Sequence, residues 1–412
     1  MTKFPRKGSS TEWIERQLRD ARRGDADWRS GRMAAHVHFA RDDILEVARD
    51  AFNMFFCENA SAVDAFPSVR RMEEDLVSMS LDLCSAPPGA GGVVTGGGTE
   101  SIFLAMAAAR ALLAPRVLAR GGVPECVVPV SAHPAFEKAA GYLGLRLRHV
   151  ELGADFCADA GRMREALGDD TIVVVGSAPS FPYGTVDPIR EIAAAAAERG
   201  VWMHVDACNG GYLLPFLRDG DTLLPPFDFA LPGVNSISID VHKYGFAPKG
   251  VSSILYRDGA HARLHRFESD IWKRGRYSTP GFAGSRPAGS IAAAWAVIHY
   301  LGREGYGELA RRVVGVRTRL EEALGALGLH LVGRPQLGVA AFTAPGMDAR
   351  ALVDALHDEG WHVGRLDHPP ALHLMLTPAQ EPVVDIFAAD VASALGLCKV
   401  TNVHAEAEHT TL

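Results

Sequence analysis

Residues 236–250 read SISIDVHKYGFAPKG, and the interpretation of the whole chain starts from this stretch. An alternating strand at 236–240 leads directly into His242 and Lys243, after which glycine and proline break the chain. Lysine is almost never fully buried unless it is paired or used in chemistry. A desolvated lysine amine can attack an aldehyde cofactor and form a Schiff base. A surface lysine at a strand end is the other explanation, and this segment alone does not decide between them.

Upstream of this stretch, predicted strands and helices alternate along the chain. The strands are 126–130, 146–152, 171–176 and 201–205, and the helices are 134–143, 161–167 and 188–199. Such alternation predicts right-handed βαβ units and an α/β fold with a mainly parallel sheet. Ligands of these sheets bind beyond the carboxyl ends of the strands. His133, Ser177, Asp206 and Lys243 each follow a strand, so we expect one crevice to gather them.

A glycine-rich stretch precedes the helix that is predicted to start at Ile102. Residues 87–98 read PPGAGGVVTGGG, and the helix is expected from Ile102. Glycines let the backbone approach a ligand closely, and a helix N-terminus favours an anion such as phosphate. The stretch is not the GxxxxGKS loop of nucleotide-binding proteins. A simple helix N-cap by Thr99, with Ser101 nearby, would explain the same residues.

Composition narrows the class of protein. The chain has 412 residues, a formal charge of −7 and 48% hydrophobic residues, which suits one large domain or two unequal ones with a sizeable core. The mild acidity argues against nucleic acid as the main partner. The longest apolar run, 102–113, contains Arg110 and falls short of the roughly 18 residues of a membrane span. The N-terminus lacks the apolar core of a secretory signal. Six scattered cysteines suggest free thiols, so we expect a cytoplasmic protein.

The remaining segments predict further helices and a second domain. Helices are expected at 11–29, 42–56, 69–83, 290–325, 349–359 and 383–395, with Asp42 or Asp43 capping the second of these. A strand is expected at 251–256. The polar loop 267–287 is too long for a simple connector, which suggests a functional role. The predicted organisation is an N-terminal arm with helices (1–57), a large domain (58–288), a smaller α/β domain (289–401) and a polar tail (402–412).

Pyridoxal 5′-phosphate is the cofactor that needs the groups gathered at the predicted crevice. Lys243 would hold its aldehyde, and Asp206 would keep the pyridine nitrogen protonated so that the ring accepts electrons. His133 could stack on the ring, while Gly98, Thr99 and His242 could bind the phosphate. Each residue has a plainer explanation: Asp206 could cap a turn and His133 could be an ordinary loop histidine. Their shared position at one sheet edge favours the cofactor.

Several stretches also resemble the group II pyridoxal-phosphate decarboxylase superfamily, and within it most closely the sphingosine-1-phosphate lyases. The stretches, spread over residues 66–306, are TGGGTESIFLA from Thr95, SAHPAFEKAAGYLG from Ser131, SAPSFPYGTVDPI from Ser177, HVDACNGGYLLPF from His204, SISIDVHKYGFAPKGVSSILY from Ser236 and AGSRPAGSIAAAW from Ala283. The resemblance implies fold type I, like aspartate aminotransferase, and a homodimer with active sites at the subunit interface. It also implies a small-molecule amine or amino-acid substrate.

The resemblance assigns roles residue by residue. Lys243, Asp206 and His133 would be the catalytic residues. Cofactor contacts would come from these three and from Gly97, Gly98, Thr99, Ser177, Cys208, His242 and Ser285. Ser285 would reach the cofactor phosphate of the neighbouring subunit. His38, Tyr183 and Lys249 would face the substrate, and Lys249 matches a lysine near the substrate phosphate in the lyases.

The chain departs from the lyase pattern at the substrate end. His38 stands where the lyases have a tyrosine, and Ala62 stands where they have a histidine, both used toward the substrate phosphate. Asn209 replaces an apolar residue, and Val241 replaces the threonine before His242. We also expect no N-terminal membrane segment of the kind that the eukaryotic lyases carry.

The leading hypothesis is therefore a pyridoxal-phosphate-dependent carbon–carbon lyase that breaks a β-hydroxy amine into an aldehyde and an amine. The alternative is α-decarboxylation of an L-amino acid with the same machinery, and the changes at His38 and Ala62 add weight to it. A catalytically inactive relative would be expected to lose Lys243 or Asp206, and both are present. A metal enzyme is disfavoured because the sequence has no HExxH motif and no paired Cys/His spacing, and His36 and His38 alone are a weak ligand set.

Overall fold

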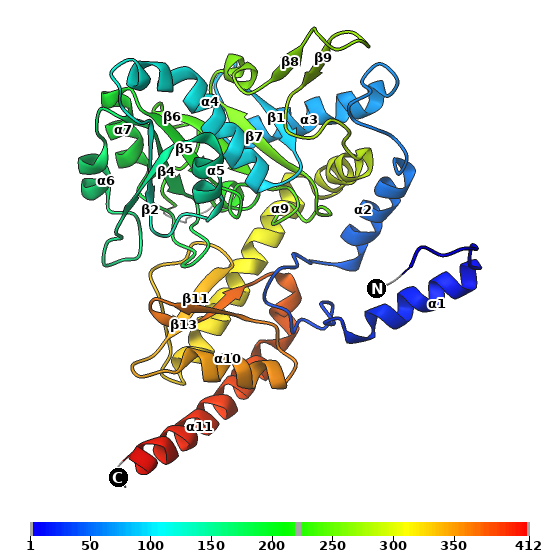
Figure 1. The fold of residues 1–412 in the computed structure, drawn as a ribbon. Coiled ribbons are helices and arrows are strands. Elements are labelled where there is room, and N and C mark those ends of the chain that lie inside the picture. The colour runs from blue at the N-terminus through cyan, green and yellow to red at the C-terminus, as the bar shows by residue number, and fades with distance from the viewer. Residues whose placement is uncertain (1–2, 219–223, 410–412) are drawn as a thin grey trace.

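A seven-stranded sheet forms the centre of the large domain in this computed structural model, which describes residues 3–218 and 224–409 and side chains as far as residue 396 (Figure 1). The strand order is β1-β7-β6-β5-β4-β2-β3. The strands are β1 (Gly91–Thr95), β2 (Glu125–Pro129), β3 (Arg146–Val150), β4 (Thr171–Ser177), β5 (Trp202–Asp206), β6 (Val234–Ile239) and β7 (Ser252–Tyr256). The pairs from β3 to β6 are parallel, and β7 runs antiparallel to both β1 and β6. The predicted α/β fold with a mainly parallel sheet is confirmed.

Helices cover both faces of this sheet, so its strands carry apolar side chains on both sides. Val173 and Val175 of β4 belong to the core that includes α4 (Gly98–Leu118) and α5 (Ala135–Leu143). Val174, between them, belongs to the core on the opposite face. Alternate residues of a strand point to opposite faces, which explains why β4 is apolar throughout. The opposite core is covered by α3 (Pro67–Leu83), α6 (Ala160–Ala166), α7 (Ile189–Arg199) and α8 (Leu214–Arg218).

Helix α4 is long and apolar enough, by length and composition, to cross a membrane. It is the one such helix among the described residues, and more than half of its most apolar 18-residue window is buried inside the protein. Ten of its residues are buried, including Ile102, Leu104 and Met106. Its apolar character is therefore that of a helix packed within the core.

The smaller C-terminal domain is built on a four-stranded antiparallel sheet in the order β10-β11-β13-β12. The strands are β10 (His330–Leu331), β11 (Val339–Thr343), β12 (Gly364–Asp367) and β13 (Pro370–Met375), with the helices α10 (Ala349–Asp358) and α11 (Val384–His409). Helix α9 (Ala288–Gly325) joins the domains, because its first part lies in the large-domain core and Val316, Leu320 and Leu324 lie in the small-domain core. Gly302, at φ 55°, interrupts its helical geometry.

The N-terminal residues contact both domains. Helix α1 (Thr11–Ala21) has no buried residue and extends away from the body of the protein (Figure 1). The backbone N–H of Ala34 donates to the carbonyl of His362 in the small domain at 2.9 Å. Helix α2 (Asp42–Met54) packs along α9. The N-terminal segment thus lies across the junction of the two domains.

Local details differ from the sequence-based expectations. Arg41, not Asp42 or Asp43, occupies the N-cap position of α2, and it makes no side-chain capping bond. Helix α4 starts at Gly98 with Gly97 at its N-cap position, so the alternative explanation of this stretch, an N-cap by Thr99, does not hold. The glycine-rich stretch contains β1, and the loop 267–287 contains a short hairpin, β8 (Phe267–Ser269) with β9 (Tyr277–Thr279). The expected polar tail is helical as far as His409, and 410–412 lie outside the described residues.

Candidate active site

A cavity of about 930 Å³ opens at the carboxyl ends of the parallel strands. Its lining comes from the glycine-rich turn, the segments after β2, β4, β5 and β6, and the loop before α9. The lining residues are Gly96, Gly97, Gly98, Thr99, Glu100, Ile102, Phe103, His133, Lys138, Tyr142, Ser177, Pro179, Phe181, Asp206, Cys208, Asn209, Asp240, His242, Lys243 and Phe282. Nine of the predicted site residues are among them, so the predicted crevice exists.

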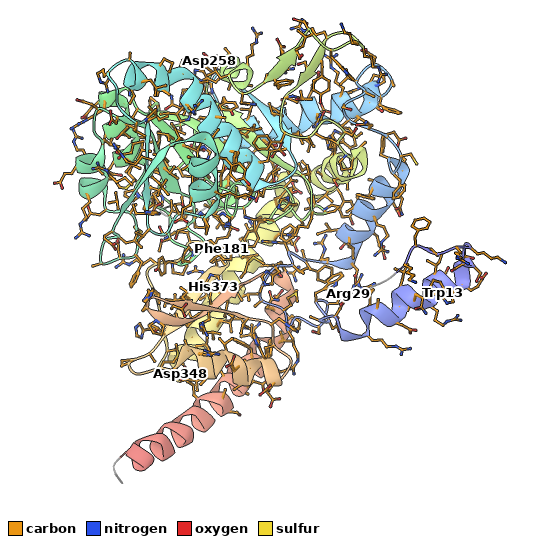
Figure 2. All side chains as sticks on the ribbon, viewed as in Figure 1. Trp13, Arg29, Phe181, Asp258, Asp348 and His373 are labelled. Carbon is orange, nitrogen blue, oxygen red and sulfur yellow. The ribbon has the colours of Figure 1, made fainter. Side chains whose placement is uncertain are left out.

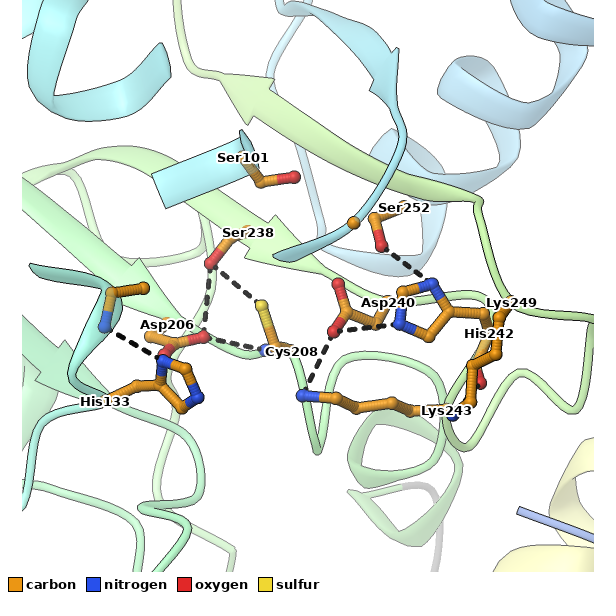
Figure 3. Close-up of polar contacts among 12 residues, drawn as sticks. Ser101, His133, Asp206, Cys208, Ser238, Asp240, His242, Lys243, Lys249 and Ser252 are labelled. Carbon is orange, nitrogen blue, oxygen red and sulfur yellow. Dashed lines mark hydrogen bonds and ion pairs between the residues drawn. The ribbon is translucent and has the colours of Figure 1, made fainter. Parts of the chain in front are cut away.

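Lys243 forms an ion pair with Asp240 at the cavity wall (Figure 3). Its Nζ lies 3.0 Å from Oδ2 of Asp240, whose side chain is almost fully buried. Burial alone would lower the pKa of Lys243, but the charges of Asp240, Cys208 and Asp206 outweigh it and raise that pKa. Burial would likewise raise the pKa of Asp240, and the nearby Lys243 and His242 hold it below its usual value. In this state Lys243 is a protonated amine that Asp240 holds at the cavity wall.

Asp206, at the end of β5, is fixed by a short hydrogen-bond chain. Its Oδ1 accepts from the Ser238 hydroxyl at 3.2 Å and from the backbone N–H of Cys208 at 3.1 Å. Ser238 in turn lies 3.3 Å from Nε2 of His204, a fully buried residue whose Nδ1 lies 2.8 Å from the Ser236 hydroxyl. Burial lowers the pKa of His204 to about 4, so this histidine is neutral near pH 7. Oδ2 of Asp206 is left for a partner in the cavity.

The glycine-rich turn forms a cradle at the start of α4. A Cβ atom on Gly98 would lie 2.8 Å from Sγ of Cys208 and 2.9 Å from Oδ2 of Asp240, so this position has no room for a side chain. The helix begins at this residue, and its N-terminal N–H groups and dipole favour an anion. Thr95 and Ser101 join their hydroxyls at 2.7 Å beneath the turn. The backbone itself is therefore exposed to a ligand here.

Glu100 ties this cradle to the loop before α9. Its Oε2 accepts from the backbone N–H of Gly96 at 2.7 Å, and its Oε1 accepts from the backbone N–H of Phe282 at 2.9 Å. The Phe282 ring meets Phe103 edge-on with centroids 5.2 Å apart, and Phe103 meets Tyr142 in the same way at 5.6 Å. One carboxylate thus holds together the anion cradle and the aromatic mouth of the cavity.

His133 and His242 present their rings at the cavity with their tautomers fixed. The backbone N–H of Ala135 donates to Nδ1 of His133 at 3.1 Å, so a neutral His133 carries its proton on Nε2. Nδ1 of His242 lies 2.9 Å from the carbonyl of Val251, which can only accept, and therefore carries the proton. Figure 3 shows Asp206 and His133 on one side of the Lys243 amine, and Asp240 and His242 on the other.

These residues fit pyridoxal 5′-phosphate. The cavity offers an amine for the aldehyde, a carboxylate for the pyridine nitrogen, a histidine ring on an open face and a glycine cradle for the phosphate. Asn209 Oδ1 and Asp240 Oδ1, which belong to buried lining residues, have no hydrogen-bond partner among the described residues, which indicates that the site is completed by a polar ligand. No group of three or more His, Cys, Asp or Glu side chains suited to a metal ion occurs in the described part of the chain.

Four predicted residues lie outside the cavity lining. Tyr183 donates from its hydroxyl to the carbonyl of His368 in the small domain at 2.7 Å, while its neighbour Phe181 lines the cavity. Ser285 accepts from Nδ2 of Asn59 at 3.2 Å. Lys249 donates to the carbonyl of His242 at 3.2 Å, and the His38 ring meets the edge of Tyr244 at 4.8 Å. Lys249 and His38 lie beside the Lys243 segment, whereas Tyr183 belongs to the junction between domains.

The sequence-based interpretation missed several lining residues. Asp240 was counted as part of an alternating strand, although the DxxK spacing places its carboxylate beside Lys243 and could have signalled the pair. Glu100 lies within the glycine-rich motif, and nothing in the sequence indicates its contact with the loop before α9. The apolar mouth residues Phe103, Tyr142 and Phe282 come from three separate segments, and no local pattern connects them.

Comparisons with known proteins agree with this site. The family model for the pyridoxal-dependent decarboxylase conserved domain matches residues 26–344. The sphingosine-1-phosphate lyase of Arabidopsis thaliana is 37% identical over 407 residues, which are 96% of this chain and 74% of that protein. The lyase of Saccharomyces cerevisiae is 37% identical over 366 residues, and the match spans 87% of this chain but only 61% of that protein. A probable L-tyrosine/L-aspartate decarboxylase of Methanothermobacter thermautotrophicus is 39% identical over 332 residues, 81% of this chain and 89% of that protein.

The solved structure of a Burkholderia pseudomallei sphingosine-1-phosphate lyase matches the whole chain and 96% of its own, with a TM-score of 0.91 and 36% identity. A glutamate decarboxylase of Lactobacillus brevis, with 21% identity over 96% of this chain and 94% of its own, shares the fold at a TM-score of 0.84. The predicted family, enzyme class and cofactor are thereby confirmed. The chain therefore belongs to the pyridoxal-dependent decarboxylase family, as a lyase that depends on pyridoxal 5′-phosphate.

Proposed function

We propose that this protein cleaves the carbon–carbon bond of a phosphorylated β-hydroxy amine, of the sphingosine-1-phosphate type, to give an aldehyde and a phosphorylated amine. The similarity to sphingosine-1-phosphate lyases over nearly the whole chain supports this proposal. The eukaryotic sphingosine-1-phosphate lyases are longer than this chain, which spans 61–75% of their lengths, so a shared substrate is a proposal.

A basic cluster beside Lys243 is the observation that carries the proposal. Both ring nitrogens of His38 are buried and have no hydrogen-bond partner among the described residues. Burial lowers the pKa of His38 well below its usual value, and the charges of Lys249, Lys243 and His242 lower it further. The pKa of Lys249 is lowered as well, by burial and then by Lys243. An anionic substrate group would supply the missing partner and relieve this repulsion.

The residues of the chain have distinct tasks in this reaction. The bound cofactor supplies an electron sink for the bond that breaks. Lys243 Nζ would hold the cofactor aldehyde covalently and, once the substrate amine has displaced it, could carry a proton at the reacting carbon. Asp206 keeps a negative charge at the pyridine nitrogen, and the buried Ser238–His204 chain holds its carboxylate in place. His133 presents the face of its ring and excludes water from one side of the cofactor.

A homodimer belongs to the same proposal. Ser285 lies outside the cavity of its own subunit and is held by Asn59. In the dimer that we propose, Ser285 contacts the cofactor phosphate in the neighbouring subunit. The size of the complex in solution, together with the cofactor affinity of Ser285→Ala, tests this part.

Decarboxylation of an L-amino acid is the second candidate, and two observations favour it. The probable L-tyrosine/L-aspartate decarboxylase is 39% identical to this chain over 332 residues, and the match spans 89% of the decarboxylase. Ala62 has only a methyl side chain, which cannot donate a hydrogen bond to a substrate phosphate, and it lies in the segment between α2 and α3. Only the second observation concerns the substrate end, where the two reactions would differ, since the cofactor end serves either reaction.

One experiment separates the two reactions. The holoenzyme is given phosphorylated β-hydroxy amines, their unphosphorylated forms and a panel of L-amino acids, and aldehyde and carbon dioxide are measured in the same samples. Aldehyde from the phosphorylated amines supports the lyase, and carbon dioxide without aldehyde supports the decarboxylase. Lys243→Ala is the control, because it should abolish both products and the cofactor absorbance band. A protein that takes up no pyridoxal 5′-phosphate would contradict both candidates.

A further inference from the structure

The segment that follows β4 has one side on the cavity and the other on the small domain. Pro179 and Phe181 line the cavity. Two residues later, Tyr183 and Gly184 make their contacts with the small domain. Phe181 is 41% exposed and is one of the residues that line the cavity. This segment is therefore the place where the small domain meets the cavity wall.

Three hydrogen bonds from the small domain hold this segment. His373 Nε2 lies 2.9 Å from the carbonyl of Phe181, and the two rings lie 4.9 Å apart (Figure 2). The Tyr183 hydroxyl donates to the carbonyl of His368 at 2.7 Å. The backbone N–H of Gln336 donates to the carbonyl of Gly184 at 2.9 Å. Backbone and side-chain bonds thus fix the segment along its length.

The hydrogen bond between His373 and the Phe181 carbonyl can have only one direction. A carbonyl oxygen only accepts, so Nε2 of His373 carries the proton and donates. His373 lies on β13, where it is 6% exposed, so water competes little for this bond. At Gly184 a Cβ atom would lie 1.9 Å from the carbonyl of Val339, so the backbone of the segment packs directly against the start of β11 and leaves no room for a side chain there. The backbone of Phe181 is consequently anchored to the small domain at the cavity wall, and its ring contacts the ring of His373.

We propose that Phe181 determines specificity for the apolar part of the substrate amine, and that His373 is the residue that positions it. An aromatic ring whose exposed face lines a cavity gains free energy when an apolar ligand group covers it. Losing the His373 bond frees the Phe181 backbone, so the ring no longer presents a fixed surface. The inference rests on the proposed function only in the choice of amine, because either candidate substrate can carry an apolar group.

The test uses the holoenzyme and two amines with the same phosphorylated head, dihydrosphingosine 1-phosphate and phosphoethanolamine. Binding is followed by the change in the cofactor absorbance band, so turnover is not required. Phe181→Ala and His373→Leu should each lower the preference for the long-chain amine by about tenfold, which corresponds to ~1.4 kcal/mol. His373→Gln should keep most of the preference, since its amide N–H can still donate to the Phe181 carbonyl.

His357→Leu is the matched control. His357 also faces a backbone carbonyl within the small domain, that of Val363 at 3.3 Å, and it does not line the cavity. This variant should leave the preference unchanged. Amide exchange in the apoprotein gives a second measurement: the amides of Phe181, Tyr183 and Gly184 should exchange faster in His373→Leu but not in His357→Leu. Unchanged exchange in His373→Leu, or an unchanged preference in Phe181→Ala, overturns the inference.

Failure of the proposed function gives a different result. If neither phosphorylated amine perturbs the wild-type absorbance band, the lyase proposal fails, and the same variants are titrated with L-tyrosine and L-aspartate. Phe181→Ala should then lower the preference for L-tyrosine, because the apolar wall would face the amino-acid side chain. A preference that stays unchanged with both pairs of ligands overturns the role of Phe181.

Discussion

The ammonium nitrogen of Lys243 lies 3.0 Å from Oδ2 of Asp240, which stands three residues earlier in the chain. The charge of Asp240 contributes to a raised pKa of Lys243, although burial acts in the opposite direction. An amine attacks an aldehyde only in its neutral form. In the apoprotein the charge of Lys243 is therefore paired with that of Asp240. The same pairing lowers the fraction of neutral amine and should delay the reaction of Lys243 with the cofactor.

Replacing Asp240 by asparagine should shift cofactor uptake to lower pH. The variant removes the charge that raises the pKa of Lys243, and a change of about one pKa unit gives roughly tenfold more neutral amine at a given pH. The measurement is the rate of pyridoxal 5′-phosphate uptake by the apoprotein as a function of pH. Asp270→Asn, an exposed acid, is the control. Superimposable pH profiles for wild type and Asp240→Asn would disprove this role.

Replacement of glycine by alanine in the cradle should be harmful at Gly98 and tolerated at its neighbour Gly97. Gly98→Ala places a Cβ 2.8 Å from Sγ of Cys208 and should cost about 1–3 kcal/mol in the free energy of unfolding, with a strong loss of cofactor affinity. Gly97→Ala places its Cβ no closer than 3.8 Å, to Cε1 of His242, and its extended backbone suits alanine. Thermal unfolding and cofactor titration compare them. Equal losses in both variants would mean that the space at Gly98 is not decisive.

Glu100→Ala should loosen the loop before α9 without unfolding the protein. The carboxylate accepts from the backbone of Gly96 and of Phe282, so its removal leaves both N–H groups without this acceptor. Amide exchange of residues 281–285 should accelerate, and cofactor affinity should fall because the cradle loses an anchor. Glu137→Ala, which removes an exposed glutamate near His149, should do neither. Unaltered exchange in Glu100→Ala would show that the carboxylate does not hold the loop.

Acidification should destabilise the protein through its buried histidines. The pKa of His204 is lowered by burial from 6.5 to about 4. Between these values the unfolded state binds more protons than the folded state, so the free energy of unfolding rises with pH across the window. His204 should contribute about 3 kcal/mol that is present above pH 6.5 and lost as the pH falls toward 4.

Denaturant unfolding of wild type and His204→Gln, above and below this window, measures that contribution. The variant should lose less stability on acidification than the wild type. It will retain part of the effect, because burial also lowers the pKa of His242 and His373, which remain. A pH dependence as steep as that of the wild type would exclude His204 as a source.

The parts of the site that follow strands could be predicted from the sequence. Asp206, Ser177 and His133 come directly after apolar strands, and a parallel sheet necessarily brings such positions to one edge. Lys243 stood out because a buried lysine requires a partner or a reaction. The parallel order of β2 to β6 followed from the same alternation of strands and helices.

The rest depends on contacts between distant segments, which leave no local pattern. Glycines made β1 resemble a turn, because they weaken strand propensity, yet β7 supplies its hydrogen-bond partners. Tyr183 and Phe181 lie two residues apart in a segment without regular periodicity, so the sequence could not show which one faces the cavity. The link from Glu100 to Phe282 joins positions 182 residues apart, and only the folded chain reveals it.

Helix α9 has a thermodynamic consequence. Because its residues belong first to the large-domain core and then to the small-domain core, neither core can melt without exposing part of the same helix. The interruption at Gly302 lies in the part of α9 that belongs to the large-domain core, well before Val316. The two domains should therefore share one cooperative transition in calorimetry, with a calorimetric enthalpy close to the van't Hoff value. A chain cut within α9 should yield two fragments that do not fold separately.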